Sequence, residues 1–214
     1  DFLKMLLGTV SQISQNPYKL IYLIDYMQLN DAIKKRRSVT RYLNKKPDWR
    51  KVVRAIDAAR YAPNADNLFA MKFILISNEE TINKFFDASQ QDFVSKAKYL
   101  VVAVSDDSKL VAHYKERGTR YSALQAGAAI QNFLLELMEQ GLVTKWVKYF
   151  YDEKVKEILG IPEKMIVEGL FPIGLETKIK TGAEVLTDLE NIVFFEKWGE
   201  KKMTPNPIVT LENS

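Results

Sequence analysis

A dense group of cations stands in the first third of this 214-residue sequence. Between positions 34 and 60 there are eleven Lys and Arg residues against two Asp, a net charge of +9, whereas the whole chain carries +4. Within this basic segment, Arg36 and Arg37 are followed directly by Ser38. Guanidinium groups donate paired hydrogen bonds to phosphate oxygens, and a hydroxyl adds a neutral donor. These residues are candidates for an anion site; the alternative is a solvated helix end, where cations favour the helix dipole.

A second group of polar residues follows at positions 62–67, in the sequence APNADN. Asn64 and Asn67 carry amides that both donate and accept hydrogen bonds, as recognition of a heteroaromatic ring edge requires. Pro63 precedes them and holds the chain out of a helix. The alternative is an ordinary turn made of typical turn residues.

Other kinds of chemistry are excluded by what the chain lacks. It has no Cys and one His, His113. Disulfides, thiolate nucleophiles, Fe–S clusters and Cys-ligated zinc are therefore absent, and a site with several His ligands is impossible. We expect no metal site. If the protein is an enzyme, a cofactor carries its reaction.

The elements that must position these groups alternate between helix and strand. Residues 72–77 and 99–105 are short apolar runs rich in branched side chains, which predicts buried strands. Asn30 is expected to cap a helix over 31–35, and Asp48 opens a second helix in which Val53 belongs to the buried stripe. Further helices are expected over 79–86, 120–140 and 152–159, and further strands over 144–150 and 165–174. The pattern predicts an α/β or α+β class with a central sheet.

The chain is long enough for one domain with appendages. We expect a helical extension over 1–26, the main domain over 27–199 and an extended arm over 200–214. No run reaches the roughly 18–20 apolar residues that a membrane span needs. The first 26 residues also lack the basic start and small-residue cleavage site of a signal peptide. The expectation is a cytoplasmic protein without membrane association.

Five segments, in order, resemble the nitroreductase family of flavoproteins. The first two are RRSVT at 36–40 and APNADN at 62–67. The third comprises ERGTRY at 116–121 and QAGAAIQN at 125–132, and the fourth comprises WVKYFYD at 146–152, LGIP at 159–162 and PIG at 172–174. The fifth is the segment 189–199, which ends in FEKWG. Each motif is weak alone, but their order along the chain is specific.

The resemblance implies an α+β fold in which a central mixed, mainly antiparallel sheet is flanked by helices. It also implies an intertwined homodimer with FMN at the subunit interface. Arg36, Arg37 and Ser38 would contact the FMN phosphate and the pyrimidine side of the flavin. Pro63, Asn64 and Asn67 would reach the ribityl chain and ring from the partner subunit.

Further positions follow from the same resemblance. The backbone of Lys148 and Tyr149 would lie beside the N5 edge of the flavin, and Gly174 would lie on the strand that flanks the ring. Thr40 stands where the family usually has Arg or Lys. The family's C-terminal phosphate-binding cations are missing at 186–189, and nearby Lys180 could substitute for them.

The implied activity is that of an FMN-dependent oxidoreductase. Hydride would pass from NAD(P)H through the flavin to an electron-poor acceptor such as a nitroaromatic or a quinone. The alternative is a flavin-free or weakly flavin-binding dimeric scaffold of the same fold with a decayed site. Nucleic-acid binding ranks last, because the basic segment lacks interleaved aromatic residues and a known recognition motif.

Overall fold

The computed structural model describes residues 27–177 and 186–203. The expected helical extension over 1–26, Lys180 and residues 204–214 of the expected arm lie outside the described residues. The chain divides into two compact units, Asp1–Lys180 and Thr181–Ser214. The first unit contains the sheet and its flanking helices.

The sheet has four strands in the order β1-β2-β4-β3, and the pairs between neighbours are antiparallel. Its strands are β1 (Met71–Ile76), β2 (Tyr99–Ser105), β3 (Val143–Thr144) and β4 (Ile166–Gly174). A parallel bridge between Ser38 and Thr144 adds a mixed element at the β3 edge. The predicted α+β class with a mainly antiparallel sheet is confirmed.

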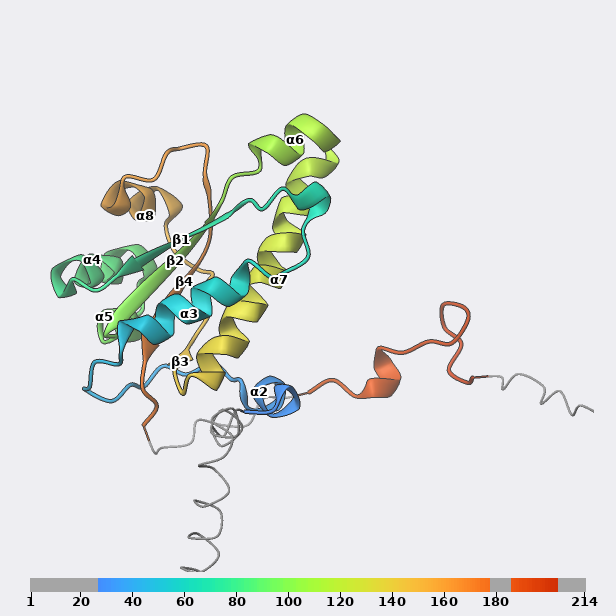
Figure 1. Cartoon of the computed structure of the whole chain (residues 1–214), viewed down its shortest axis with the longest axis horizontal. Helices are drawn as coiled ribbons and strands as arrows, with labels where there is room; N and C mark the ends of the chain where they lie inside the picture. The colour runs from blue at the N-terminus through green and yellow to red at the C-terminus, as the bar shows by residue number, and fades with distance from the viewer. Residues whose placement is uncertain (1–26, 178–185, 204–214) are drawn as a thin grey trace, which may run out of the picture. The chain divides into compact units, whose positions relative to one another are not determined.

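Helices cover both faces of the sheet (Figure 1). On one face lie α3 (Trp49–Ala59) and α7 (Arg117–Glu139). On the other lie α4 (Glu79–Ser89), α5 (Asp92–Ser95) and α8 (Asp152–Leu159). The remaining described helices are α2 (Leu29–Lys35), α6 (Ser108–Tyr114) and the short 3₁₀ turns η2 (Ala65–Asn67) and η3 (Leu189–Asn191).

Strand β2 separates two apolar cores. Val101 and Ala103 pack with α3 and α7, whereas Leu100 and Val102 pack with α4, α5 and α8. Successive side chains of a strand point to opposite faces, so a strand covered on both faces must be apolar throughout. This explains why its sequence, YLVVAVS, is apolar up to its last residue, Ser105, whose hydroxyl donates to the Glu168 carboxylate at 2.6 Å.

Several predicted element boundaries are wrong. Helix α2 begins at Leu29, so Asn30 lies inside it, and its N-cap residue, Gln28, makes no side-chain capping bond. Asp48 does cap α3, by accepting a hydrogen bond from the backbone N–H of Arg50 at 3.0 Å. Val53, placed on the buried stripe of α3, is 42% exposed.

The strand predicted over 144–150 is also shorter than expected. Only Val143 and Thr144 pair with β4 as a strand, and Val147 makes one further isolated bridge. The register of these pairs places Lys145 opposite Pro172, which has no N–H to donate, so the ladder is interrupted there. Farther along β4, the Trp146 indole N–H donates to the carbonyl oxygen of Glu168 at 3.0 Å.

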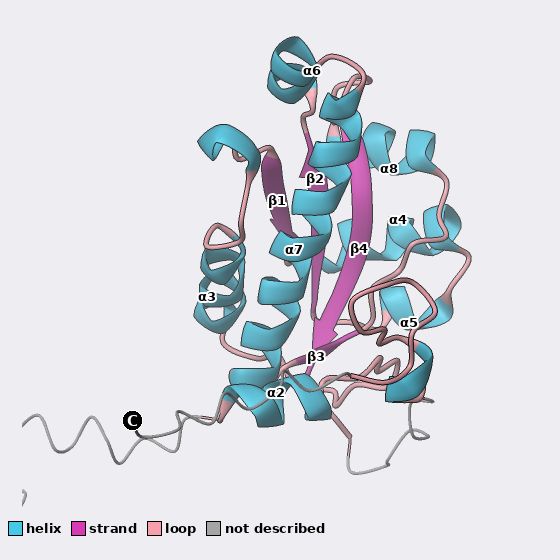
Figure 2. Ribbon diagram, turned by 90° about the vertical axis from the view of Figure 1, so that its right-hand side faces the viewer, coloured by secondary structure: helices cyan, strands magenta, loops and turns pink. Residues whose placement is uncertain are grey.

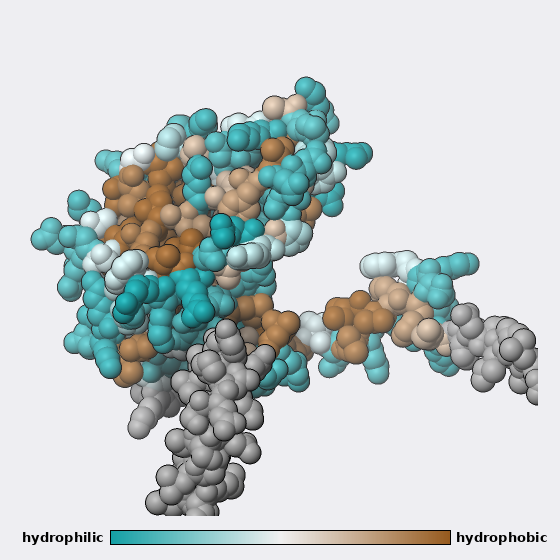
Figure 3. Space-filling model, viewed as in Figure 1, coloured by the Kyte–Doolittle hydropathy of each residue, from teal (hydrophilic) through white to brown (hydrophobic). Residues whose placement is uncertain are grey.

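The described part of the second unit, 186–203, is largely exposed. Within it, the ring centres of Phe194 and Trp198 lie 4.7 Å apart, and the Phe195 N–H donates to the Glu200 carbonyl at 2.9 Å. Across the described ranges, 27–177 and 186–203, no helix has the length and hydropathy to cross a membrane. In the first unit, apolar side chains gather over the sheet edge formed by β1, framed by polar residues (Figure 3).

Candidate functional site

The segment that follows α2 runs along the end of the sheet. The Val39 N–H donates to the Thr144 carbonyl at 3.0 Å, and the Leu43 N–H donates to the Leu175 carbonyl at 2.9 Å. These bonds place Ser38 beside β3 and extend the sheet edge without forming a regular strand. The predicted anion-binding residues are therefore held by backbone pairing at the ends of β3 and β4.

Arg37 is the most constrained side chain of this group. Its guanidinium forms an ion pair with Glu176, just beyond the end of β4. Its Nε is buried and has no hydrogen-bond partner within the described residues, and the same holds for the hydroxyl of Thr144. Buried polar groups are almost always paired, so two orphaned groups at one place mark a candidate contact with a polar ligand. We call Arg36, Arg37, Ser38 and Thr144 the arginine half-site.

Tyr42 and Thr40 continue the same segment. Tyr42 bridges to Glu176 and its hydroxyl donates to the Val39 carbonyl at 3.0 Å. Its ring lies against Gly174, which has no side chain to obstruct it. Burial raises the pKa of the Tyr42 phenol well above its ordinary value. Thr40 lies between the backbone hydrogen bonds of Val39 and Leu43, and its side chain is half-buried.

The asparagine-containing loop lies against the N-terminal half of α7. Pro63 and Asn64 line a shallow pocket of about 240 Å³ together with Leu124 and Gln125 of that helix. The Asn64 amide donates to the Ala62 carbonyl at 3.3 Å, which leaves its own oxygen buried and without a partner in the described part of the chain. Gln125 is 5% exposed.

Two buried residues of α7 add to this second cluster. Both the amide nitrogen and the amide oxygen of Gln125, and the hydroxyl of Ser122, have no hydrogen-bond partner among the described residues. Sequence reasoning did not identify either residue as part of a site. Their polarity on a helix otherwise buried by apolar side chains was the available signal. We call Pro63, Asn64, Asn67, Ser122 and Gln125 the amide half-site.

The loop of the amide half-site is held from the side by α6. Asp66 and Asn67 have positive φ values of 49° and 57°, a conformation that Asp and Asn tolerate better than most residues. The Asp66 carboxylate lies 2.8 Å from Nε2 of His113. A hydrogen bond with Asp66, followed by desolvation, raises the pKa of the Tyr114 phenol. His113 is thus an exposed side chain that anchors this loop.

The two half-sites lie at opposite ends of α7 (Figure 2). Lys51, near the start of α3, donates to the carbonyl of Gln140 just after α7 at 2.8 Å. From there α3 leads back along α7 to the loop at Asn64. At 1.5 Å per helical residue, Gln125 and Gln140 are separated by about 22 Å along the helix axis. The structure therefore does not bring the Arg37 and Asn64 groups together within one chain.

The orphaned atoms coincide with these half-sites. In residues 27–177 and 186–203, the buried side-chain polar atoms without a partner belong to the following residues: Arg37, Asn64, Ser122, Gln125 and Thr144. Arg37 and Asn64 are site residues predicted from the sequence; Thr144 lies beside Arg37 through its bridge to Ser38, and Gln125 lines one pocket with Asn64, one turn of α7 from Ser122. Two separate regions of one chain are thus each prepared for polar contacts that the chain itself does not supply.

Lys148 and Tyr149 follow the arginine half-site on the loop after β3. The Lys148 ammonium lies 4.6 Å from the centre of the Trp146 ring, and the Tyr149 side chain is 76% exposed. The Tyr149 carbonyl accepts a hydrogen bond from the Gln91 amide at 3.2 Å, which fixes the backbone there. Lys180, the remaining predicted site residue, lies outside the described residues.

Comparison with known proteins gives a consistent result. The model of the nitroreductase family matches residues 33–94 and 84–175. A protein of Methanothermobacter thermautotrophicus with the provisional name NADH dehydrogenase/NAD(P)H nitroreductase is 26% identical over 179 residues, which are 82% of this chain and 90% of that protein.

Solved structures share the fold. A nitroreductase family protein from Clostridium difficile superimposes with a TM-score of 0.70 at 25% identity, covering 80% of this chain and 99% of the other. An FMN-dependent nitroreductase from the same species gives a TM-score of 0.64 at 22% identity, covering 78% and 98%. The family model spans most of the first unit and includes the arginine half-site, the Asn64 loop and α7, so this chain belongs to the nitroreductase family.

Proposed function

We propose that this protein is an FMN-dependent oxidoreductase that works as an intertwined homodimer. In this proposal hydride passes from NAD(P)H through the flavin to an electron-poor acceptor such as a nitroaromatic or a quinone. The observation that carries the proposal is the set of orphaned buried polar atoms in the two half-sites. Family membership supports flavin chemistry, and the absence of Cys makes a cofactor the source of reactivity.

The residues of the arginine half-site suit the phosphate-bearing and pyrimidine portions of FMN. The unpartnered Nε of Arg37 is a buried donor, and the Thr144 hydroxyl can donate or accept. Ser38, exposed beside Thr144, adds a further hydroxyl. Fixed positive charge here would favour the anionic reduced flavin, which is how a protein tunes this cofactor.

A second copy of the chain supplies what one copy lacks. Related by a two-fold axis, two chains can place the arginine half-site of one beside the amide half-site of the other, and each dimer then has two equivalent sites. The Gln125 amide can both donate and accept in such a site, as can the free oxygen and amide of Asn64. Leu124, 62% exposed on α7 next to them, supplies apolar surface for the same contact.

When bound, FMN supplies hydride transfer between nicotinamide and acceptor. The chain's own residues need only bind, orient and exclude water. The backbone of Tyr149, fixed by Gln91, is proposed to line the flavin edge where hydride is exchanged. No side-chain nucleophile is required.

A flavin titration tests this proposal. FMN added to the purified protein should lose fluorescence and bind with one FMN per chain, and NADH or NADPH should then bleach the bound flavin under anaerobic conditions. Arg36→Gln should weaken FMN binding, whereas the matched control Lys34→Gln, which removes a charge from exposed α2, should not. Absence of FMN binding to the unmodified protein would refute the proposal.

One observation favours a second candidate, the flavin-free scaffold. The Arg37–Glu176 ion pair already occupies part of the guanidinium that the phosphate would need. Under this alternative, the protein is a dimer of the same size but binds no FMN at any practical concentration. Sedimentation combined with the same titration separates the two candidates.

A further inference from the structure

The arginine half-site contains only two of the eleven cations of the basic segment, Arg36 and Arg37. Lys46 lies eight residues beyond Ser38 and borders a different cavity, of about 660 Å³. This cavity lies between the 42–46 segment, the start of α4 and the residues between α5 and β2. A volume of this size is within the range of small-molecule sites in proteins.

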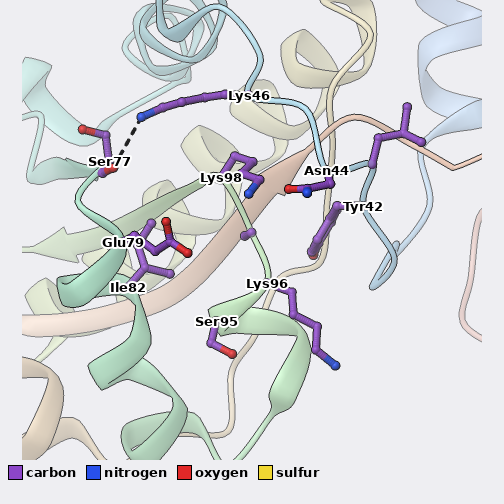
Figure 4. Close-up of a pocket in the computed structure, with 11 residues that line it drawn as sticks. Tyr42, Asn44, Lys46, Ser77, Glu79, Ile82, Ser95, Lys96 and Lys98 are labelled. Atoms are coloured by element: carbon purple, nitrogen blue, oxygen red, sulfur yellow. Dashed lines mark hydrogen bonds between the residues drawn. The ribbon is translucent and has the colours of Figure 1, made fainter.

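The cations of this cavity come from two parts of the chain. Lys46 belongs to the basic segment, and Lys96 and Lys98 lie just before β2. Lys46 reaches across the cavity and donates to the Ser77 carbonyl at 3.5 Å, and its ammonium lies 5.0 Å from the centre of the Tyr99 ring (Figure 4). Lys98 is half-buried, and no acidic partner for it or for Lys96 is found in residues 27–177 and 186–203.

Asn44 and Lys98 both line the cavity, so it offers a donor amide and an ammonium (Figure 4). Lys96 lies at the lower rim of the same view. The cavity is also lined by Ser95 beside Lys96, by Ser77 at the tip of Lys46, and by the carboxylate of Glu79 (Figure 4). The Ser95 hydroxyl donates to the Asp92 carbonyl at 2.9 Å and keeps its oxygen as an acceptor. Glu79 is the single carboxylate among the lining residues, so the described cavity has a net positive charge.

The groups that line the cavity suit different parts of a ligand. Ammonium groups and an amide donor bind phosphate, with Lys acting as a point charge. A carboxylate with nearby hydroxyls instead accepts hydrogen bonds from ligand hydroxyl groups. Ile82 and Leu43 add limited apolar surface. The arrangement fits a phosphate ester of a polyhydroxy compound better than a purely apolar ligand.

We propose that this cavity binds a small phosphorylated sugar or similar polyhydroxy phosphate ester. The phosphate is held by Lys46 and Lys98, and the hydroxyl groups face Glu79 and Ser95. This site is separate from the proposed flavin site, because it uses none of the residues of the two half-sites. Its occupancy therefore does not depend on whether the protein binds FMN.

Calorimetry with the purified full chain tests the proposal, using ribose 5-phosphate, inorganic phosphate and ribose as probes. Ribose 5-phosphate should bind more tightly than inorganic phosphate, and ribose should show no measurable binding. If phosphate binds as well as the ester, the polyhydroxy part of the proposal is wrong. If no probe with a phosphate group binds at millimolar concentration, the whole proposal is wrong.

Variants locate the binding. Lys98→Gln and Lys46→Gln should each weaken the binding of ribose 5-phosphate about tenfold, as expected for loss of one charge-assisted hydrogen bond. Lys84→Gln, on the exposed face of α4 away from the cavity, is the matched control and should bind normally. Two separate lysine variants guard against a folding defect in either one.

The cations of the arginine half-site also attract phosphate esters, so a separate variant must test binding there. A variant with both Arg36→Gln and Arg37→Gln should still bind ribose 5-phosphate with unchanged affinity. If this variant loses binding while Lys98→Gln retains it, the ester binds at the arginine half-site and the proposed cavity site is refuted. That outcome would leave the flavin proposal standing.

Discussion

Tyr42 packs its ring directly on Gly174, so closely that a Cβ built on the glycine would lie 2.7 Å from the Cβ of the tyrosine. This contact ties the 37–43 segment to the last residue of β4. Arg37 and Ser38 lie on that same segment, beside Glu176 and Thr144. The glycine thus has a packing role at the place where the family resemblance predicts contact with a flavin ring.

The Gly174→Ala variant should be less stable than the unmodified protein. Overpacking of this kind typically costs about 1–3 kcal/mol, because neighbouring backbone or side chains must shift. Urea denaturation measures the difference. In a Tyr42→Gly background the clashing Cβ and ring are both removed, so the added methyl group has space and the same change should cost much less. Equal costs in both backgrounds would show that the two residues do not interact as the packing indicates.

Replacement of Asp48 should weaken the start of α3 in a pH-dependent manner. Hydrogen bonds from the side chain and backbone of Arg50 lower the pKa of Asp48. A carboxylate with a lowered pKa contributes stability above its unfolded-state value of about 3.9, and that contribution is lost as the pH falls through the folded-state pKa. Asp48→Ala should therefore lower the urea midpoint at pH 7, and the difference should shrink in acid.

Asp48→Asn is the matched control for this change. Asparagine also accepts the capping hydrogen bond but carries no charge. It should keep most of the stability at pH 7 and lose the acid dependence. A gap between the Ala variant and the unmodified protein that stays constant down to the acid limit would argue against a role for the Asp48 charge.

The sheet could be predicted from sequence where burial is complete. Both faces of β2 are covered, so its residues are apolar up to the closing Ser105, and its bounds, Tyr99–Ser105, follow directly. The strand predicted over 144–150 failed for the opposite reason. Its apolar residues are real, but Lys145 falls opposite Pro172 of β4, which cannot donate to the ladder. Which residue faces that proline is decided by the strand register in the fold, and no local pattern reveals it.

The same limit applies to the candidate sites. Arg36, Arg37 and Ser38 were identified by type and spacing. Their neighbours Thr144 and Glu176 lie more than a hundred residues away, and only the fold brings them near. Lys98 and Lys46, which line the cavity proposed to bind a phosphate ester, likewise belong to different segments of the chain. A charge run in sequence indicates an anion site but cannot show how its members divide between two places.

Glu176 should reduce FMN affinity in the proposed flavin site. Its carboxylate occupies the Arg37 guanidinium and would repel a nearby phosphate. Glu176→Gln keeps the size of the side chain and removes the charge, so FMN should bind about fivefold more tightly, corresponding to an ion pair of about 1 kcal/mol. Fluorescence titration with FMN measures the change.

The control for Glu176→Gln is Glu153→Gln, which removes an exposed carboxylate from the first turn of α8. It changes the net charge equally, so any general electrostatic effect would appear in both variants. If both strengthen FMN binding to the same extent, the gain comes from net charge. If Glu176→Gln weakens binding, Glu176 supports the site by orienting Arg37.

Leu124→Glu should separate the two chains of the proposed dimer and weaken FMN binding in the same step. Leu124 is 62% exposed on α7 and borders Gln125 and Asn64, so a buried charge at a two-fold contact would be present twice and would be costly. Sedimentation velocity should show a shift from dimer to monomer, and FMN affinity should fall because each site loses its second half.

Phe86→Glu, at a 40% exposed position on α4 across the sheet, is the matched control and should remain a dimer that binds FMN normally. A Leu124→Glu protein that stays dimeric with full FMN affinity would place the subunit contact elsewhere and would remove the amide half-site from the flavin site.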